Sequence, residues 1–153
     1  MYEYFWFPLR GRLGVFIPIY YATGAIHGIY GGHLNGMTCV YKPKYDRFTF
    51  GKDLLDSKIN MTVVAPSHVA ALEKAGLQNG ALSFVETIFI GGEAIPPAQM
   101  GAFRKTSQLL GIKHIINGYG MTETGSMSGY SQEGFGDPDD VSIIPIPGVR
   151  YRI

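Results

Sequence analysis

Cysteine is almost absent from this chain. The single cysteine, Cys39, excludes an intramolecular disulfide. It stands in the apolar run 37–41, so we expect a buried small hydrophobic residue rather than a reactive thiol. Sparse cysteine is compatible with a reducing compartment, and we expect the protein to be cytoplasmic.

Charged side chains are also scarce. They make up 16% of the 153 residues, against about 25% in typical soluble domains, and the formal net charge is only +1. The sequence has no basic run, which argues against nucleic acid as a partner. Because aromatic residues are plentiful, we expect a piece of a larger core. Other parts of the same domain would cover the apolar surface that it leaves exposed.

Charge is missing altogether between Leu13 and Tyr41. That length exceeds the roughly 20 residues of a membrane-spanning helix, and Gly24-x-x-x-Gly28 matches a close-packing membrane motif. Pro18 and several glycines interrupt the stretch, however. A buried strand, helix and strand fits these interruptions better, so membrane insertion is not expected.

Short apolar runs alternate with helical patterns along the rest of the chain. The sequence predicts strands at 13–19, 37–41, 61–65, 85–90 and 114–116, and helices at 24–34, 48–59, 67–75 and 96–110. The glycine-, serine- and aspartate-rich segment 125–140 predicts an irregular loop. The alternation favours an α/β fold with a mostly parallel sheet flanked by helices. Such sheets bind ligands at the carboxyl ends of their strands.

Common catalytic and zinc motifs are missing as well. The four histidines have no metal-ligand spacing, and there is no Gly-x-Ser-x-Gly sequence. The pattern therefore predicts neither a zinc site nor a hydrolase-type serine nucleophile.

What is present is a pair of glycine-bearing segments, each directly after a predicted strand. The first is 91–94 and the second is 117–123. In the second, glycines on both sides of Tyr119 let a flat ligand approach the backbone. The Tyr119 ring can stack on a base, an interaction worth about 1–3 kcal/mol.

The residues by themselves leave structural readings open. Tyr119 could instead pack on the core at the end of a strand. Thr122 could satisfy its own turn, and Glu123 could be a solvated carboxylate. A turn that merely begins the next helix is the alternative for the segment 91–94.

The second segment closely resembles the Tyr-Gly-x-Thr-Glu motif of the adenylate-forming superfamily. That superfamily includes acyl-CoA synthetases, firefly-type luciferases and the adenylation domains of nonribosomal peptide synthetases. Three further segments, 16–21, 89–96 and 145–153, resemble blocks of this superfamily in the same order. Tyr21 stands where the family often has histidine, and it would shape the acyl pocket or pack in the core.

The resemblance implies roles for particular residues. Tyr119 would stack on adenine, Thr122 would donate its hydroxyl to the α-phosphate, and Glu123 would bind Mg²⁺. The backbone of the first segment would wall the adenine and the start of the acyl pocket. The complete implied binding set is Gly91, Gly92, Glu93, Ala94, Asn117, Gly118, Tyr119, Gly120, Met121 and Thr122, with Glu123 on the metal.

The implied activity is ATP-dependent activation of a small carboxylate. The products would be acyl-AMP and then acyl-CoA, with ATP, Mg²⁺ and coenzyme A as cofactors and co-substrate. The family's phosphate loop, ribose-binding segment and C-terminal lid domain have no counterpart here. We therefore expect residues 1–153 to be a single incomplete AMP-binding domain, the central part of the large domain, without turnover on its own.

Two alternatives remain at this point. The chain could belong to an amino-acid adenylation domain of a nonribosomal peptide synthetase. Met121 favours the CoA ligases, because those adenylation domains usually carry proline there. The uncharged run from Leu13 to Tyr41 also allows a noncatalytic membrane or interaction protein.

Overall fold

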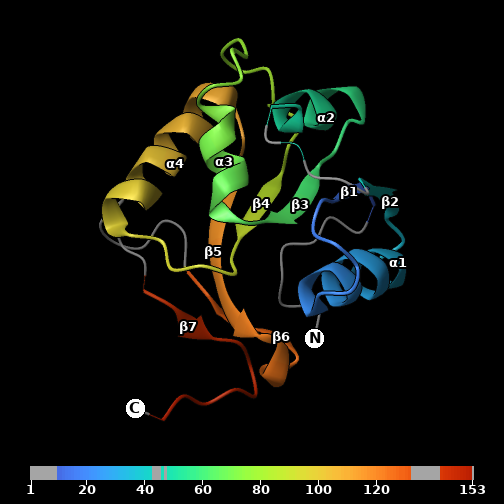
Figure 1. Cartoon of the computed structure of the whole chain (residues 1–153), viewed down its shortest axis with the longest axis vertical. Coiled ribbons are helices and arrows are strands. Elements are labelled where there is room, and N and C mark those ends of the chain that lie inside the picture. Colours follow the sequence, from blue (N-terminus) through green and yellow to red (C-terminus); the bar gives the residue numbers. More distant parts are fainter. Residues whose placement is uncertain (1–9, 43–45, 47, 132–141, 153) are drawn as a thin grey trace.

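A twisted sheet forms the centre of the molecule. The structure, a computed structural model, describes residues 10–42, 46, 48–131 and 142–152 (Figure 1). The strand order is β2-β1-β3-β4-β5-β6-β7. The strands are β1 (Arg12–Val15), β2 (Thr38–Tyr41), β3 (Met61–Val64), β4 (Thr87–Ile90), β5 (His114–Met121), β6 (Ser126–Tyr130) and β7 (Ile144–Pro145).

The pairing changes direction along the sheet. The strands from β2 to β5 pair in parallel, and β6 and β7 continue the sheet in antiparallel pairing. The predicted α/β fold with a mostly parallel sheet is therefore confirmed.

Helices cover both faces of the sheet. Their bounds are η2 (Gly24–Gly31, a π-helix), α1 (Gly32–Leu34), α2 (Phe50–Asp56), α3 (Pro66–Leu72), α4 (Pro97–Leu110) and the 3-10 turn η3 (Thr122–Thr124). α2, α3 and α4 pack on one face, whereas η2 and α1 lie on the other (Figure 1).

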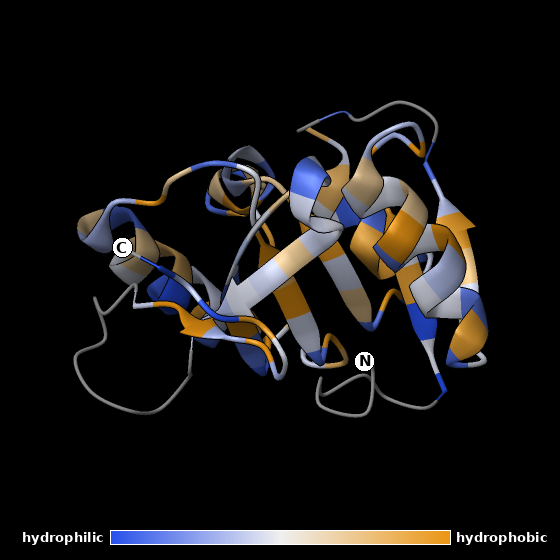
Figure 2. Ribbon diagram, turned by 90° about the horizontal axis from the view of Figure 1, so that it is seen from below, coloured by the Kyte–Doolittle hydropathy of each residue, from blue (hydrophilic) through white to orange (hydrophobic). Residues whose placement is uncertain are grey.

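Side chains along the central strands point alternately to the two faces of the sheet and form a hydrophobic core on each face. In β4, Ile88 and Ile90 join the cluster under α2, α3 and α4, whereas Phe89 joins the cluster on the opposite face. Successive strand side chains point to opposite faces, so an apolar run buried on both sides needs apolar residues at every position. Figure 2 shows hydrophobic stretches along the strands of the sheet.

The long helix matches its prediction closely. α4 ends at Leu110 and is followed by Gly111, which adopts the left-handed conformation at φ 80°, a common helix stop. Met100 and Phe103 are fully buried on its inner face. The expected helix 24–34 forms as η2 and α1. It lies so close to the sheet that a side chain at Gly28 would come within 2.7 Å of Val15 Cγ1.

Several expectations need correction. The strand expected at 13–19 ends at Val15, and α2 and α3 are shorter than predicted. Cys39 is only half-buried; its thiol donates to the carbonyl of Gly28 at 3.3 Å. Its strand, β2, lies at the edge of the sheet, which leaves less cover than a central strand has.

The surface of the described residues carries large apolar side chains. They are Ile19, Tyr20, Tyr21, Tyr30, Leu34, Tyr41, Phe48, Leu109, Tyr119, Met121, Ile144 and Tyr151. None of the helices described is both long enough and apolar enough to cross a membrane.

Candidate functional site

The candidate site forms where β5 extends beyond its parallel neighbour. β5 pairs with β4 as far as Asn117, opposite Ile90. From Gly118 to Met121 it pairs instead with β6. The prediction of a strand ending at 116 is therefore too short. The predicted loop is wrong for residues 126–130, and its positions 132–140 lie outside the described residues.

Tertiary pairing explains both corrections. β6 has the sequence Ser-Met-Ser-Gly-Tyr, which is poor in the β-branched residues that favour strands. It becomes a strand because η3 reverses the chain and brings it alongside the extended end of β5. The register shifts between Tyr119 and Gly120, which marks a β-bulge of the kind found beside binding sites.

The two glycine-bearing segments lie side by side. Gly91 follows the last residue of β4, and its amide donates to the Val64 carbonyl at 3.0 Å. A side chain at Gly91 would approach the Gly118 carbonyl oxygen to 2.9 Å. The structure thus brings the start of the segment 91–94 against Gly118 of the segment 117–123, at the carboxyl ends of β4 and the parallel part of β5.

Most of the predicted site residues are accessible. Gly92, Glu93, Ala94, Thr122 and Glu123 are exposed, and Gly91, Gly118 and Gly120 are half-buried. The side chains of Tyr119 and Met121 are each 48% exposed. Packing of the Tyr119 ring inside the core is therefore excluded.

Two predicted residues behave differently from the rest. Asn117 is 8% exposed, and its amide and carbonyl both bond to Ser131, at 2.9 and 2.7 Å. Its backbone holds β5 and the end of β6 together. Tyr21 is 55% exposed and contacts the Tyr20 ring at 4.7 Å between centroids, so the core-packing alternative for Tyr21 is wrong.

A threonine outside the predicted set shapes the turn that carries Thr122 and Glu123. The Thr124 hydroxyl accepts from the Met121 amide at 3.2 Å and donates to the Met121 carbonyl at 3.0 Å. The Gly125 amide donates to the Thr122 carbonyl at 3.1 Å. These bonds hold η3 as a defined turn on the surface.

A buried histidine contacts Ser126, which lies just after this turn. His27 of η2 is 7% exposed, and its Nε2 lies 2.9 Å from the Ser126 hydroxyl. Ser126 has a φ of 91°, which is rare for a residue other than glycine and clusters at functional sites. Sequence reasoning missed this pair because its members are 99 positions apart.

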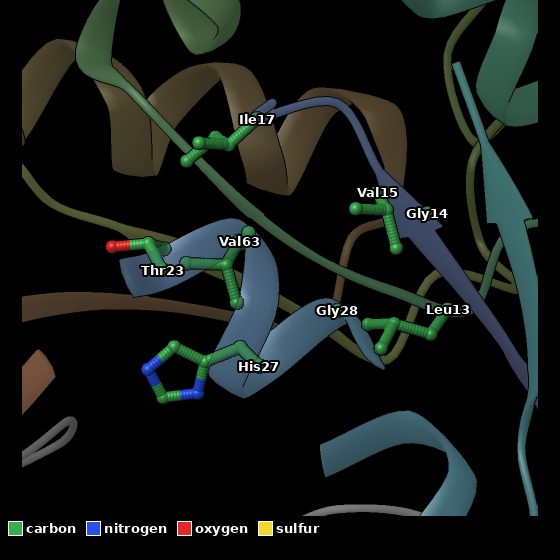
Figure 3. A pocket seen from close by; sticks show the side chains of 9 residues that line it. Leu13, Gly14, Val15, Ile17, Thr23, His27, Gly28 and Val63 are labelled. Atoms are coloured by element: carbon green, nitrogen blue, oxygen red, sulfur yellow. The ribbon is translucent and has the colours of Figure 1, made fainter. Parts of the chain in front are cut away.

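His27 also lines the small hollow shown in Figure 3. η2 supplies one side, and β1 and Val63 of β3 supply the other. The hollow has a volume sufficient for about one water molecule. Among the described residues, His27 Nδ1 is buried without a hydrogen-bond partner. His27 therefore places a buried polar group next to Ser126, the first residue of β6.

Acid should destabilise the fold through its buried histidines. Burial lowers the pKa of both His27 and His68 from 6.5 to about 4. The unfolded chain takes up these protons first as the pH falls, so the stabilisation is complete above pH 6.5 and is lost as the pH approaches 4. Each histidine accounts for on the order of 1–3 kcal/mol. Urea unfolding between pH 7 and pH 4 measures the loss.

A histidine substitution separates this effect from the titration of other groups. His68 lies edge-on to Phe50 at 5.3 Å between ring centroids. His68→Leu should reduce the loss of unfolding free energy between pH 6.5 and pH 4, and the contribution of His27 should remain. His33→Asn removes an exposed histidine and is the control. If the unfolding free energy of the two variants falls equally with pH, His68 is not a source of the acid sensitivity.

The residues present fit a magnesium-nucleotide. Glu123 is a single exposed carboxylate, and no three His, Cys, Asp or Glu side chains of the described part cluster into a metal cage. Mg²⁺ binds in this manner, through one or two carboxylates together with water and substrate phosphates. The Tyr119 ring is exposed, and the glycines beside it place no side chain in the way of a flat base.

The chain matches one protein family and several solved structures. The sequence profile of the AMP-binding enzyme family matches residues 1–153, and no curated protein sequence matches significantly. MatB from Rhodopseudomonas palustris is similar at 20% identity, with a TM-score of 0.77 for the apo form, covering 96% of this chain and 28% of that one. Its ATP-bound form has a TM-score of 0.71, and the match covers 90% of this chain and 26% of MatB.

Two further solved structures are similar. One is O-succinylbenzoate coenzyme A synthetase (MenE) from Bacillus subtilis in complex with AMP. It has 19% identity and a TM-score of 0.64, and the match covers 80% of this chain and 24% of MenE. The other is the Vibrio cholerae adenylation domain AlmE in complex with glycyl-adenosine-5'-phosphate. It has 17% identity and a TM-score of 0.72, and the match covers 85% of this chain and 24% of AlmE. This chain therefore spans about a quarter of their lengths. On its fold and its family match, the chain belongs to the AMP-binding enzymes, the adenylate-forming superfamily.

Proposed function

We propose that this chain supplies the adenine and magnesium contacts of an enzyme that activates a carboxylate with ATP. The product would be an acyl-AMP, and the acyl group would then pass to coenzyme A. The observation that carries the proposal is the exposed Tyr119 ring on the extended end of β5, next to the segment 91–94. The family match supports the adenylate-forming step.

Each exposed group would have one task. Tyr119 stacks on the adenine, and the Thr122 hydroxyl donates a hydrogen bond to the α-phosphate. Glu123 would hold Mg²⁺, and the bound ion would neutralise charge on the phosphates as the carboxylate displaces pyrophosphate. The half-buried glycines of the two segments leave the backbone open to the base.

The position of this chain in the enzyme is part of the proposal. Residues 1–153 would form the central part of the large domain. The triphosphate loop, the ribose contacts and the lid lysine would come from other segments, and those segments would also cover the exposed apolar side chains. The isolated chain should then show no carboxylate-dependent pyrophosphate release. Clear release by the isolated chain would contradict this division of labour.

Binding of AMP to the chain tests the proposal directly. Saturation-transfer NMR detects weak binding and reports which ligand protons touch the protein. We expect saturation of the adenine protons of AMP, and none of ribose 5-phosphate beyond background. Absence of transfer to the adenine protons would overturn the proposed function.

An amino-acid adenylation domain is the second candidate, because AlmE is among the similar structures. Pyrophosphate exchange by a protein that includes the flanking segments distinguishes the two. Stimulation by amino acids would favour the adenylation domain. Stimulation by simple carboxylates, with release of AMP on addition of coenzyme A, would favour the ligase.

Glu123→Gln should remove the magnesium dependence of ATP binding. The amide keeps the size of the side chain but loses its charge, and neutral oxygens bind Mg²⁺ less strongly. We expect the gain in ATP affinity on adding Mg²⁺ to fall by about tenfold, or ~1.4 kcal/mol. Titration of the protein with ATP, with and without Mg²⁺, measures this gain in affinity.

Glu93→Gln provides the matched control. Glu93 is an exposed carboxylate of the neighbouring segment, so its removal changes the net charge of the site equally. Its magnesium dependence should remain. If the two variants lose it equally, a general charge effect replaces the proposed ligand role of Glu123.

A further inference from the structure

A second tyrosine stands against the ring of Tyr119. Tyr151 and Tyr119 have ring centroids 6.0 Å apart and planes at 77°. This is the edge-to-face arrangement that aromatic pairs prefer. Both rings are partly accessible, at 43% and 48% exposed. Part of Tyr119 is therefore covered by a side chain, and the remainder is open.

A relay of hydroxyls connects the same two residues. The Tyr151 hydroxyl donates to the Ser128 hydroxyl at 3.2 Å. The Ser128 hydroxyl donates to the Tyr119 carbonyl at 3.3 Å. Tyr151 thus contacts the ring of Tyr119 directly and its backbone through one intermediate.

Backbone bonds hold Tyr151 in this place. β7 pairs with β6, with Pro145 opposite Gly129, and the Ile146 amide donates to the Ser128 carbonyl at 3.0 Å. A turn with a bond from the Val149 amide to the Ile146 carbonyl, also 3.0 Å, directs the chain back towards the site.

The residue opposite Tyr119 accommodates the contact. Gly129 pairs with Tyr119 across β5 and β6. A side chain at Gly129 would overlap the Tyr151 hydroxyl. The glycine therefore leaves the space in which Tyr151 reaches Ser128.

We infer that Tyr151 is a positioning residue that fixes the Tyr119 ring in the orientation in which it receives a base. This inference rests on the proposed function, in which Tyr119 stacks on adenine. A partly exposed tyrosine can otherwise change rotamer freely, and ordering it on binding costs affinity. A ring that is already held avoids this cost.

Tyr151→Leu tests the inference, because leucine fills apolar space but cannot form the ring contact or the relay. From the usual strength of an aromatic pair, AMP affinity should fall about 2- to 12-fold. The three-bond couplings of the Tyr119 side chain should change from one rotamer to an average. Tyr151→Phe keeps the ring and loses only the hydroxyl, so it should lie between Tyr151→Leu and the unsubstituted chain in both measurements.

A ligand without a base separates positioning from general damage. In a protein that includes the flanking segments, affinities for ATP and for tripolyphosphate are compared, both with Mg²⁺. Tyr151→Leu should weaken ATP alone, whereas a disturbed fold weakens both. Tyr30→Leu, which replaces an exposed tyrosine of η2, should change neither.

The outcomes distinguish this inference from the function on which it rests. If the unsubstituted chain fails to bind AMP, the proposed function fails. If it binds AMP and Tyr151→Leu binds equally well, or Tyr119 keeps one rotamer in that variant, the positioning role alone is overturned. Tighter binding by Tyr151→Leu would also overturn it, because Tyr151 would then occupy the place of the base.

Discussion

Gly120→Ala should destabilise the fold by about 3 kcal/mol, the upper part of the usual range for inserting a methyl group into packed structure. A side chain at Gly120 would overlap the carbonyl oxygen of Ser126 and approach the Met127 Cα to 2.7 Å. Both are backbone atoms of β6, so the strand itself would have to move. Urea unfolding of the chain at pH 7 measures the change.

Gly118→Ala is the matched control for this prediction. Gly118 lies in the same strand, β5, so the change in intrinsic strand preference is the same. The nearest atom to a side chain there is the Met127 sulfur at 3.2 Å, the flexible part of a side chain that can shift. We expect a cost of at most about 1 kcal/mol. Similar costs for the two variants would show that the β5–β6 contact is looser than described.

Gly120→Ala should also disturb the site, because β6 and the turn η3 would move with it. The Thr124 bonds to Met121 that shape η3 start at the next residue of β5. We therefore expect AMP binding to fall in Gly120→Ala even under conditions where the chain remains folded. Gly118→Ala probes the adjoining backbone with a smaller displacement.

Tyr119→Ala should weaken AMP binding by about 1–3 kcal/mol, roughly 5- to 150-fold. The ring is 48% exposed, so its removal leaves no core cavity and little change in stability is expected. The loss should come from the stacking surface. Titration of AMP followed by NMR measures the affinity, and urea unfolding checks the stability.

Tyr119→Phe identifies which part of the side chain acts. It keeps the ring and removes only the hydroxyl, so its AMP affinity should remain within about twofold, below ~0.5 kcal/mol. If Tyr119→Phe binds as weakly as Tyr119→Ala, the hydroxyl rather than the ring makes the contact. If both bind AMP as well as the unsubstituted chain, the base lies elsewhere.

The elements that the sequence predicted well are those with a strong local signal. The helix that ends before Gly111 combines an apolar face, prolines at its start and a glycine stop, and α4 forms as expected. β3 and β4 are mainly apolar runs, with one threonine each. Burial on both faces of a parallel sheet requires such runs.

The elements that the sequence missed depend on a distant partner. β6 contains glycine and serine, and only its pairing with the extended end of β5 makes it a strand. The length of β5 was underestimated for the same reason, since its second half contains glycines and has no parallel neighbour beyond Asn117. The strand preference of individual residues predicts poorly those strands that form only because a distant strand pairs with them.

The sequence by itself determined the family of this protein, its alternating α/β organisation and the two glycine-bearing segments, because short motifs and apolar periodicity are local properties of a chain. Only the tertiary structure decided that these segments lie side by side, that His27 bonds to Ser126 across 99 positions, and that Tyr151 stands against Tyr119. Such contacts join residues that are distant in sequence, and they follow from sheet order and strand register, which no local pattern specifies.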